Sequence, residues 1–212
     1  MFGSRPGGRR LSRSLWVSAL VIVAFSCAPV FGASRSAKAT VESLHAALID
    51  AAALEADTEN VWRKRVALLA PEINRGHDLD FMLEAILGPT WAEMGRAERN
   101  RLIDVHARYM VGEYATRAGA FEGAKFQYQR GRKDGLDLTH LNSTWVSGDG
   151  ERHRLSYILR RSDRGWRVVN VLADGVSELA LLHRRYHAVL SEGGVDGLIN
   201  SLENELETRR RH

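Results

Sequence analysis

Eight histidines could bind a metal ion or transfer protons: His45, His77, His106, His140, His153, His183, His187 and His212. Only His183 and His187 are four residues apart in one expected helix, a spacing that places both imidazoles on the same face. A zinc peptidase needs His-Glu-x-x-His with the glutamate as its base, whereas Arg184 and Arg185 stand between these histidines and oppose a bound cation. The pattern therefore indicates polar imidazoles on a helix surface, and we expect neither a metal nor another cofactor.

Nucleophilic and phosphate-binding patterns are equally weak. No Gly-x-Ser-x-Gly occurs, and Ser177 stands where a helix is expected to begin, so its oxygen can cap a backbone N–H. Asp174 is best explained as a turn residue. Gly148-Asp149-Gly150 lacks the third glycine of a nucleotide-binding fingerprint and is typical of a hairpin turn. These motifs predict no catalytic residue.

Large apolar and aromatic side chains are spread over segments that should face one another. They are Phe81, Met82, Ile86, Leu87, Trp91, Tyr109, Tyr114, Tyr157, Leu159, Val169, Val171 and Leu172. Periodicity indicates which faces are buried, but it does not tell whether those faces meet or leave room between them. An ordinary core and a lined cavity therefore both stay open.

Helical periodicity dominates the first half of the chain. The spacing of apolar residues predicts helices over residues 40–57, 58–70, 79–87 and about 95–117. Thr40 and Asp78 are expected to cap the first and third of these helices. Pro71 is expected to end the second, because proline lacks an N–H and clashes with the preceding turn. Gly88-Pro89 should break the chain after the third.

The second half predicts strands and then helices. Strands are expected over residues 125–131, 136–146, 152–161 and 166–172, and their short turns favour an antiparallel meander. Two helices over residues 177–190 and 195–208 should follow, separated by Gly193-Gly194. The fold class is α+β: a helical N-terminal half, a four-stranded antiparallel meander and two C-terminal helices. A sheet covered on one face by helices can hold an apolar cavity between the layers.

The N-terminus is typical of an export signal. Arg5, Arg9, Arg10 and Arg13 precede an apolar run of 11 residues at 15–25, which is too short to span a bilayer that needs ~20. Cleavage after Gly32 fits, and an uncleaved membrane anchor is the alternative. We expect a signal peptide over residues 1–32, a disordered lead-in over 33–39 and a single domain over 40–208.

Cleavage would change the charge of the chain. The whole sequence has 30 Lys+Arg and 26 Asp+Glu, and the first 32 residues hold four of the arginines and no acid, which leaves 26 of each. The basic pI of about 9.5 thus belongs largely to the signal and does not indicate a nucleic-acid partner. The single cysteine, Cys27, also lies in the signal, so the mature chain forms no disulfide. The expected location is the periplasm.

Several short motifs, in their order along about 170 residues, resemble the MlaC family of periplasmic phospholipid-binding proteins, also called the toluene-tolerance or ABC-transporter auxiliary family. Ile86-Leu87-Gly88-Pro89-Thr90-Trp91 is similar to its Leu-Gly-x-x-Trp signature. Leu155-Ser156-Tyr157-Ile158-Leu159-Arg160 is similar to its Tyr-x-Leu strand. Gly165-Trp166-Arg167-Val168-Val169-Asn170-Val171 and Asp174-Gly175-Val176-Ser177 are similar to its C-terminal part. Each motif is moderately specific, and their combination carries the resemblance.

The resemblance implies a lipid carrier without enzymatic activity. Such a carrier would bind phospholipid acyl chains and shuttle lipid between an outer-membrane lipoprotein complex and an inner-membrane ABC transporter with an MCE-domain subunit. The family includes a branch associated with hopanoid biosynthesis, so a hopanoid-related lipid also stays open. The residues predicted to line the cavity are Phe81, Met82, Trp91, Tyr109, Tyr157, Leu159 and Val171. A diacyl lipid should need a pocket at or above the top of the usual ~300–1,000 Å³, and its headgroup can stay outside, which predicts low headgroup discrimination.

Two other classes of function remain in view. A small enzyme or binding protein for an apolar metabolite would place Asp174, His140 and Tyr157 together in the cavity. A structural adaptor of an envelope complex would have a solidly packed core.

Overall fold

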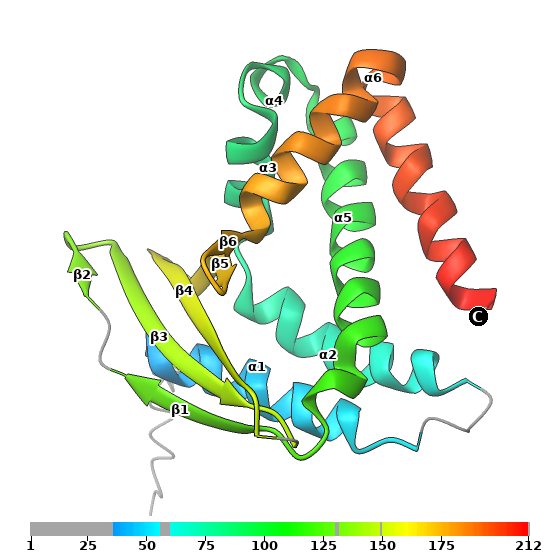
Figure 1. Ribbon diagram of the computed structural model, residues 1–212. Coiled ribbons are helices and arrows are strands. Elements are labelled where there is room, and N and C mark those ends of the chain that lie inside the picture. The colour runs from blue at the N-terminus through cyan, green and yellow to red at the C-terminus, as the bar shows by residue number, and fades with distance from the viewer. Residues whose placement is uncertain (1–35, 56–59, 130–131, 149, 212) are drawn as a thin grey trace, which may run out of the picture. The chain divides into compact units, whose positions relative to one another are not determined.

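The computed structural model describes residues 36–55, 60–129, 132–148 and 150–211, all within the unit Ser34–His212 (Figure 1). The predicted export signal and its cleavage site lie outside the described residues. Within the described part of the chain, no helix is both long enough and apolar enough to span a membrane. The observed order is helices, an antiparallel sheet and a C-terminal helix, as expected for the α+β class.

Helix α1 (Ala37–Ala52) begins earlier than predicted because Ser36 caps it instead of Thr40. The Ser36 Oγ accepts the N–H of Ala39 at 3.1 Å. The Thr40 hydroxyl instead donates to the carbonyl of Trp166 at 2.9 Å, which ties α1 to the sheet.

Helix α2 (Val61–Gly76) contains Pro71, so the prediction that this proline ends the helix is wrong. A proline inside a helix costs about 3 kcal/mol, and burial of the following turn offsets that cost. Ile73 and Gly76 are buried, and α2 packs against α1 and α5. The N–H and Nδ1 of His77 both lie 3.0 Å from the carbonyl oxygen of Ile73, which anchors the end of the helix.

Gly88 separates helix α3 (Leu79–Leu87) from the short α4 (Pro89–Glu93), and its φ of 54° confirms the predicted break. Asp78 precedes α3 but makes no side-chain cap, contrary to the prediction. Its carboxylate is instead held by Arg160 of the sheet at 2.9 Å. The long α5 (Arg96–Arg117) and the 3-10 turn η1 (Ala118–Phe121) then lead into the strands.

The sheet is antiparallel and contains the four predicted strands in the order β1-β3-β4-β5. Two further strands of two residues each, which the sequence pattern does not predict, pair with β3 and β5. The bounds are β1 (Lys125–Gln129), β2 (Lys133–Asp134), β3 (Leu138–Val146), β4 (Arg152–Ser162), β5 (Gly165–Ala173) and β6 (Val176–Ser177). The predicted β3–β4 hairpin turn is confirmed: the N–H of Gly150 donates to the carbonyl of Ser147 at 3.0 Å, although Asp149 lies outside the described residues.

Helix α6 (Glu178–Arg211) replaces the two predicted C-terminal helices, and it is kinked where they were expected to separate. Gly194 has φ 62° and ψ −161°, a left-handed conformation that glycine adopts readily. The predicted cap is confirmed, because the Ser177 Oγ accepts the N–H of Ala180 at 3.1 Å. The kink lets the C-terminal half of α6 return along α5 (Figure 1).

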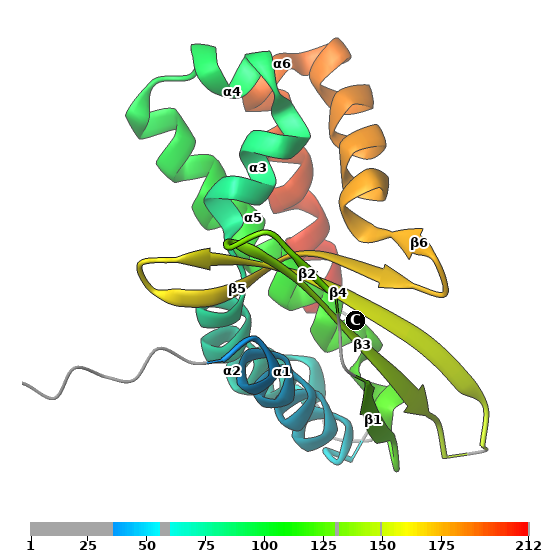
Figure 2. The same cartoon turned by 90° about the vertical axis from the view of Figure 1, so that its left-hand side faces the viewer.

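The helices lie on one side of the sheet, as Figure 1 and the rotated view in Figure 2 show. Along β4, the alternate residues Leu155, Tyr157 and Leu159 are buried on the inner face. One apolar cluster joins this face to α1, α2 and part of α5, and a second joins α3, α4, α5 and α6.

Pro71→Ala should raise the free energy of unfolding by about 1–2 kcal/mol. Residue 71 is exposed, so the change restores a helical N–H without altering the core. Urea unfolding followed by circular dichroism measures the effect, with Lys64→Ala at another exposed position of α2 as the control. A variant no more stable than the parent would mean that α2 carries its proline without cost.

Candidate functional site

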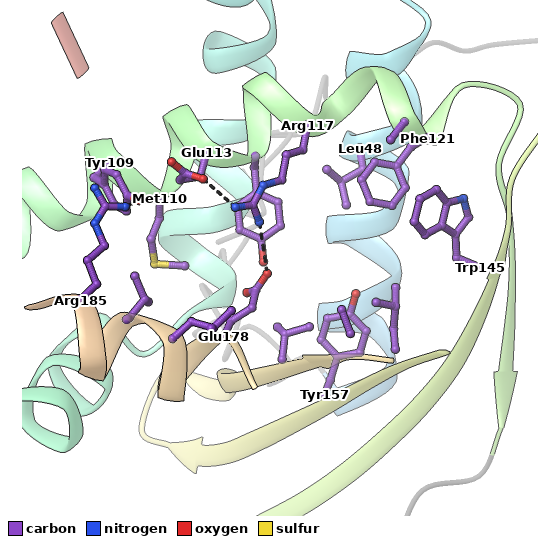
Figure 3. Close-up of a pocket in the computed structure, with 17 residues that line it drawn as sticks. Leu48, Tyr109, Met110, Glu113, Arg117, Phe121, Trp145, Tyr157, Glu178 and Arg185 are labelled. Atoms are coloured by element: carbon purple, nitrogen blue, oxygen red, sulfur yellow. Dashed lines mark hydrogen bonds and ion pairs between the residues drawn. The ribbon is translucent and has the colours of Figure 1, made fainter. Parts of the chain in front are cut away.

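A pocket of about 390 Å³ lies between the inner face of the sheet and the helical elements α1, α5, η1 and α6 (Figure 3). The neighbours of α5 are mainly α2, α3, α6 and η1 instead of the strands, so α5 forms a wall that stands off the sheet. The apolar lining residues come from every side of the pocket. They are Leu48, Met110, Ala120, Phe121, Trp145, Leu155, Val171, Ala173, Leu181 and Leu182.

Charged side chains from α5 and α6 also line the pocket. Arg117 contacts Glu113 at 2.8 Å and lies 3.8 Å from Glu178 of the facing helix. Arg185 of α6 contacts the hydroxyl of Tyr109 on α5 and the carboxylate of Glu205. Figure 3 shows that Glu113, Arg117, Glu178 and Arg185 lie toward one end of the pocket and Leu48, Phe121 and Trp145 toward the other.

Local hydrogen bonds fix the position of Glu178, the first residue of α6. The Asn170 Oδ1 on β5 accepts the hydroxyl of Ser177 at 3.1 Å and the N–H of Leu179 at 3.2 Å. Burial raises the pKa of Glu178, and nearby Glu113 raises it further, whereas Arg117 opposes both effects. The carboxylate is therefore incompletely compensated by positive charge.

Tyr114 of α5 shares a hydrogen bond with Glu178. Burial, together with this carboxylate, raises the pKa of Tyr114 well above its usual value, so its hydroxyl remains protonated and donates.

A histidine and two tyrosines form a hydrogen-bonded unit behind the pocket wall, and of these three residues Tyr157 lines the pocket. The His45 Nε2 lies 2.8 Å from the Tyr157 hydroxyl, and its Nδ1 lies 2.9 Å from the Tyr128 hydroxyl. Its ring stacks on Phe126 with centroids 3.6 Å apart. Burial lowers the pKa of His45 to about 3, so the imidazole is neutral and uses one nitrogen as donor and the other as acceptor. This unit connects α1 to β1 and β4 without placing a charge in the core.

Two further histidines are buried in the helical part of the molecule. The His106 Nδ1 on α5 lies 2.7 Å from the Tyr186 hydroxyl on α6, and burial lowers the pKa of His106 to about 3. Burial also lowers the pKa of His77 to about 4, an effect that the hydrogen bond to Ile73 partly opposes. The spacing of the histidines in the sequence singles out His183 and His187 and not these buried histidines. The burial of His45 and His106 is indicated by their positions, because both fall within apolar helical stripes.

His183 and His187 do lie on one face of α6, with ring centroids 4.3 Å apart. The His187 Nε2 lies 2.9 Å from the carbonyl oxygen of Ile86, which connects α6 to α3. Among the residues that the structure describes, no group of three or more His, Cys, Asp and Glu side chains could hold a metal ion.

Three of the seven residues predicted to line a cavity, Tyr109, Tyr157 and Val171, lie in the pocket wall. The other four lie elsewhere. The guanidinium of Arg160 lies over the ring of Phe81, 4.9 Å from the ring centroid. Met82 and Leu159 are enclosed in the first apolar cluster. Trp91 is buried in the second cluster. The sequence pattern identifies these residues as apolar and inward-facing. Whether an inward-facing side chain is packed in the core or lines a cavity depends on the position of the helix opposite it.

The three residues of the possible enzyme are not brought together. Asp174 is exposed in the turn before β6, where its carboxylate accepts the N–H of Arg154 at 2.8 Å. His140 alternates on β3 with Leu141, the partner of Tyr157, so it belongs to the opposite face of the sheet. Only Tyr157 reaches the pocket.

Helices cover one face of an antiparallel sheet and leave a mostly apolar pocket between the layers, with charged side chains toward one end, which defines an α+β protein with an internal cavity. The profile of the family described as "MlaC protein" matches residues 42–204. The chain therefore belongs to the MlaC family, which confirms the resemblance seen in its motifs.

A solved structure has a similar fold: the phospholipid-binding protein from Ralstonia solanacearum, determined in complex with a phospholipid. The TM-score is 0.68 and the sequence identity is 19%, over 81% of this chain and 95% of that chain. No curated protein matches the sequence.

The buried histidines make stability depend on pH. Because the folded pKa of His45 and His106 lies near 3, below the unfolded value of about 6.5, folding disfavours protonation. Their contribution to stability is complete above pH 6.5 and is lost as the pH falls toward 3. We expect the free energy of unfolding to drop between pH 7.5 and 5.5 by about 1 kcal/mol for each of these histidines.

Urea unfolding at the two pH values measures this drop. His106→Gln should make the drop smaller by about 1 kcal/mol, whereas His183→Gln, at an exposed position of α6, should leave it unchanged. An unaltered drop in His106→Gln would show that another group is responsible.

Proposed function

We propose that this protein is a lipid carrier that holds acyl chains in the pocket between the sheet and helices α5 and α6. The observation that carries the proposal is the apolar lining contributed by α1, η1, all three long inner strands and α6. Membership of the MlaC family supports it, as does the shared fold with a protein described as binding phospholipid. Each CH₂ removed from water contributes roughly 0.8 kcal/mol, so such walls can retain a hydrocarbon chain without a charged anchor at their apolar end.

The size of the pocket restricts what it holds. Its volume of about 390 Å³ lies near the lower end of the ~300–1,000 Å³ typical of ligand pockets, below what we expected for a whole diacyl lipid. We therefore propose that the acyl part enters while the headgroup stays at the charged end. Tyr109, Tyr157 and Val171 are the proposed lipid contacts common to sequence and structure, and Leu181 and Leu182 of α6 extend the set.

Transport would follow from binding. We propose that residues 1–32 direct export to the periplasm, where the carrier exchanges lipid between an outer-membrane lipoprotein complex and an inner-membrane ABC transporter with an MCE-domain subunit. A protein that crosses an aqueous compartment with hydrocarbon bound needs a shielded pocket, which the layered arrangement of sheet and helices supplies.

Binding is favoured over catalysis and over a purely structural role. Two polar groups of the pocket already have partners in the protein: the Tyr157 hydroxyl is held by His45 behind the wall, and Arg117 forms a largely exposed pair with Glu113. An adaptor was expected to have a solidly packed core, and the pocket is not consistent with that expectation.

Mass spectrometry tests the proposal directly. Protein purified from a Gram-negative host should carry lipid at close to one molecule per chain, visible in native spectra and lost on denaturation. Protein that is lipid-free and also takes up no added phospholipid would contradict the proposed function.

A pair of matched variants tests the location of the site. Leu181 lines the pocket and is 44% exposed, whereas Leu68 on α2 is 42% exposed and lies outside the pocket. Leu181→Glu should lower lipid retention at least severalfold, because a carboxylate in the wall opposes hydrocarbon, and Leu68→Glu should retain lipid like the parent. Equal retention by both variants would place the lipid elsewhere.

A further inference from the structure

The polarity of the pocket changes along its length. One end is aromatic and aliphatic, with the rings of Phe121 and Trp145 tilted against each other at a centroid distance of 4.5 Å. The other end carries two arginines and two carboxylates from the facing surfaces of α5 and α6 (Figure 3). A ligand that matches both ends must be an amphiphile whose polar end lies between α5 and α6.

The charges at that end are mixed in sign. Arg117 supplies a largely exposed guanidinium, which matches a phosphate in geometry and charge, whereas the guanidinium of Arg185 is held by Tyr109 and Glu205. Glu113 and Glu178 supply carboxylates, which repel a purely anionic group but attract an ammonium. The set therefore complements a headgroup that carries both charges.

Glu178 is the carboxylate best placed to accept a further cation. Its one arginine neighbour, Arg117, lies 3.8 Å away and makes the shorter contact of 2.8 Å to Glu113 instead. Arg117 is also the most solvent-exposed of the three, with 64% of its side chain accessible against 30% for Glu178. The guanidinium can therefore turn toward a phosphate at the mouth while a ligand ammonium takes its place beside Glu178.

Glu113 is less available than Glu178 for this role. It already contacts Arg117 and Arg209, the second of which comes from the C-terminal half of α6. The two carboxylates thus differ in function: Glu113 holds the helices together, and Glu178 faces the pocket with an incomplete set of cationic partners.

We propose that the charged end of the pocket is a subsite for a zwitterionic phospholipid headgroup, with the ammonium at Glu178 and the phosphate at Arg117. The inference rests on the proposed lipid-carrier function and makes it more specific. It also replaces the sequence-based expectation of low headgroup discrimination, which assumed that no charged groups lie near the lipid.

A competition between two headgroups tests the subsite. Lipid-free protein is offered an equimolar mixture of phosphatidylethanolamine and phosphatidylglycerol with identical oleoyl chains, and the bound lipids are extracted and quantified by mass spectrometry. We expect about two- to fivefold more phosphatidylethanolamine, the discrimination that one partly exposed ion pair provides. Equal loading would overturn the subsite while leaving the carrier function intact, whereas no loading of either lipid would overturn both.

Single-residue variants locate the discrimination. Glu178→Gln keeps the shape and the hydrogen-bonding oxygen but removes the charge, so the ratio of bound lipids should fall close to one. Arg117→Gln should lower the loading of both lipids, because both contain the phosphate. Asp196→Asn is the matched control: it neutralises an exposed acid of α6 that pairs with Arg101 outside the pocket, and it should keep the parental ratio.

The variants also separate a headgroup contact from a structural role. Far-UV circular dichroism and thermal melting check that Glu178→Gln is folded. A folded Glu178→Gln protein that still prefers phosphatidylethanolamine would exclude this carboxylate as the ammonium site.

Discussion

The pocket depends on one packing constraint: helix α5 is held by other helices and not by the sheet. On one side α5 approaches α2 and the C-terminal half of α6 so closely that a Cβ at Gly112 would lie 3.2 Å from a methyl of Leu206 and 3.4 Å from the ring of Trp62. On its other side, Met110 and Tyr114 face the strands across open space. Because the close contacts on the first side fix the position of α5, the second side cannot collapse onto β4, and a hollow persists inside an otherwise close-packed interior.

The kink in α6 makes this constraint possible. Before Gly194, the helix covers the end of the sheet and contributes Glu178 and Arg185 to the pocket; after it, the chain returns along α5. Arg209 from the returning half contacts Glu113, and Arg185 from the first half contacts Glu205 from the second. These ion pairs are partly exposed, so each contributes little free energy by itself. Their role is to fix the positions of the helices, because they join three helical segments that surround the pocket.

The sequence predicted the elements better than the site, and particular residues show why. Gly194 and Ser177 act through their own backbone or nearest neighbours, so local rules located the helix break and the cap. Pro71 and Asp78 also follow local rules, but distant partners override them: burial of Ile73 carries α2 past the proline, and Arg160 on β4 takes the carboxylate of Asp78. The pocket is a still less local property. Phe81 and Tyr157 have the same apolar signature, yet only Tyr157 faces the gap left by α5. Glu178 and Arg185 look like solvated helix residues in the sequence, and only the approach of α5 to α6 makes them pocket residues.

The distribution of polar groups explains how such a pocket can hold hydrocarbon at all. The Tyr157 hydroxyl in the apolar wall is held by His45 behind it. This imidazole stays neutral because burial keeps its pKa near 3, and the hydroxyls of Tyr128 and Tyr157 occupy both ring nitrogens. Because the Tyr157 hydroxyl already has a hydrogen-bond partner in the protein, an acyl chain that packs against it removes little hydration, and the free-energy cost is small. The charged groups Arg117 and Glu178 lie at the other end of the pocket, where the Arg117 side chain is largely exposed to water. Both groups therefore lose only part of their hydration. In the proposed carrier, the apolar end therefore supplies the free energy of retention, while the charged end can distinguish headgroups without adding a buried charge that would hinder the release of the lipid.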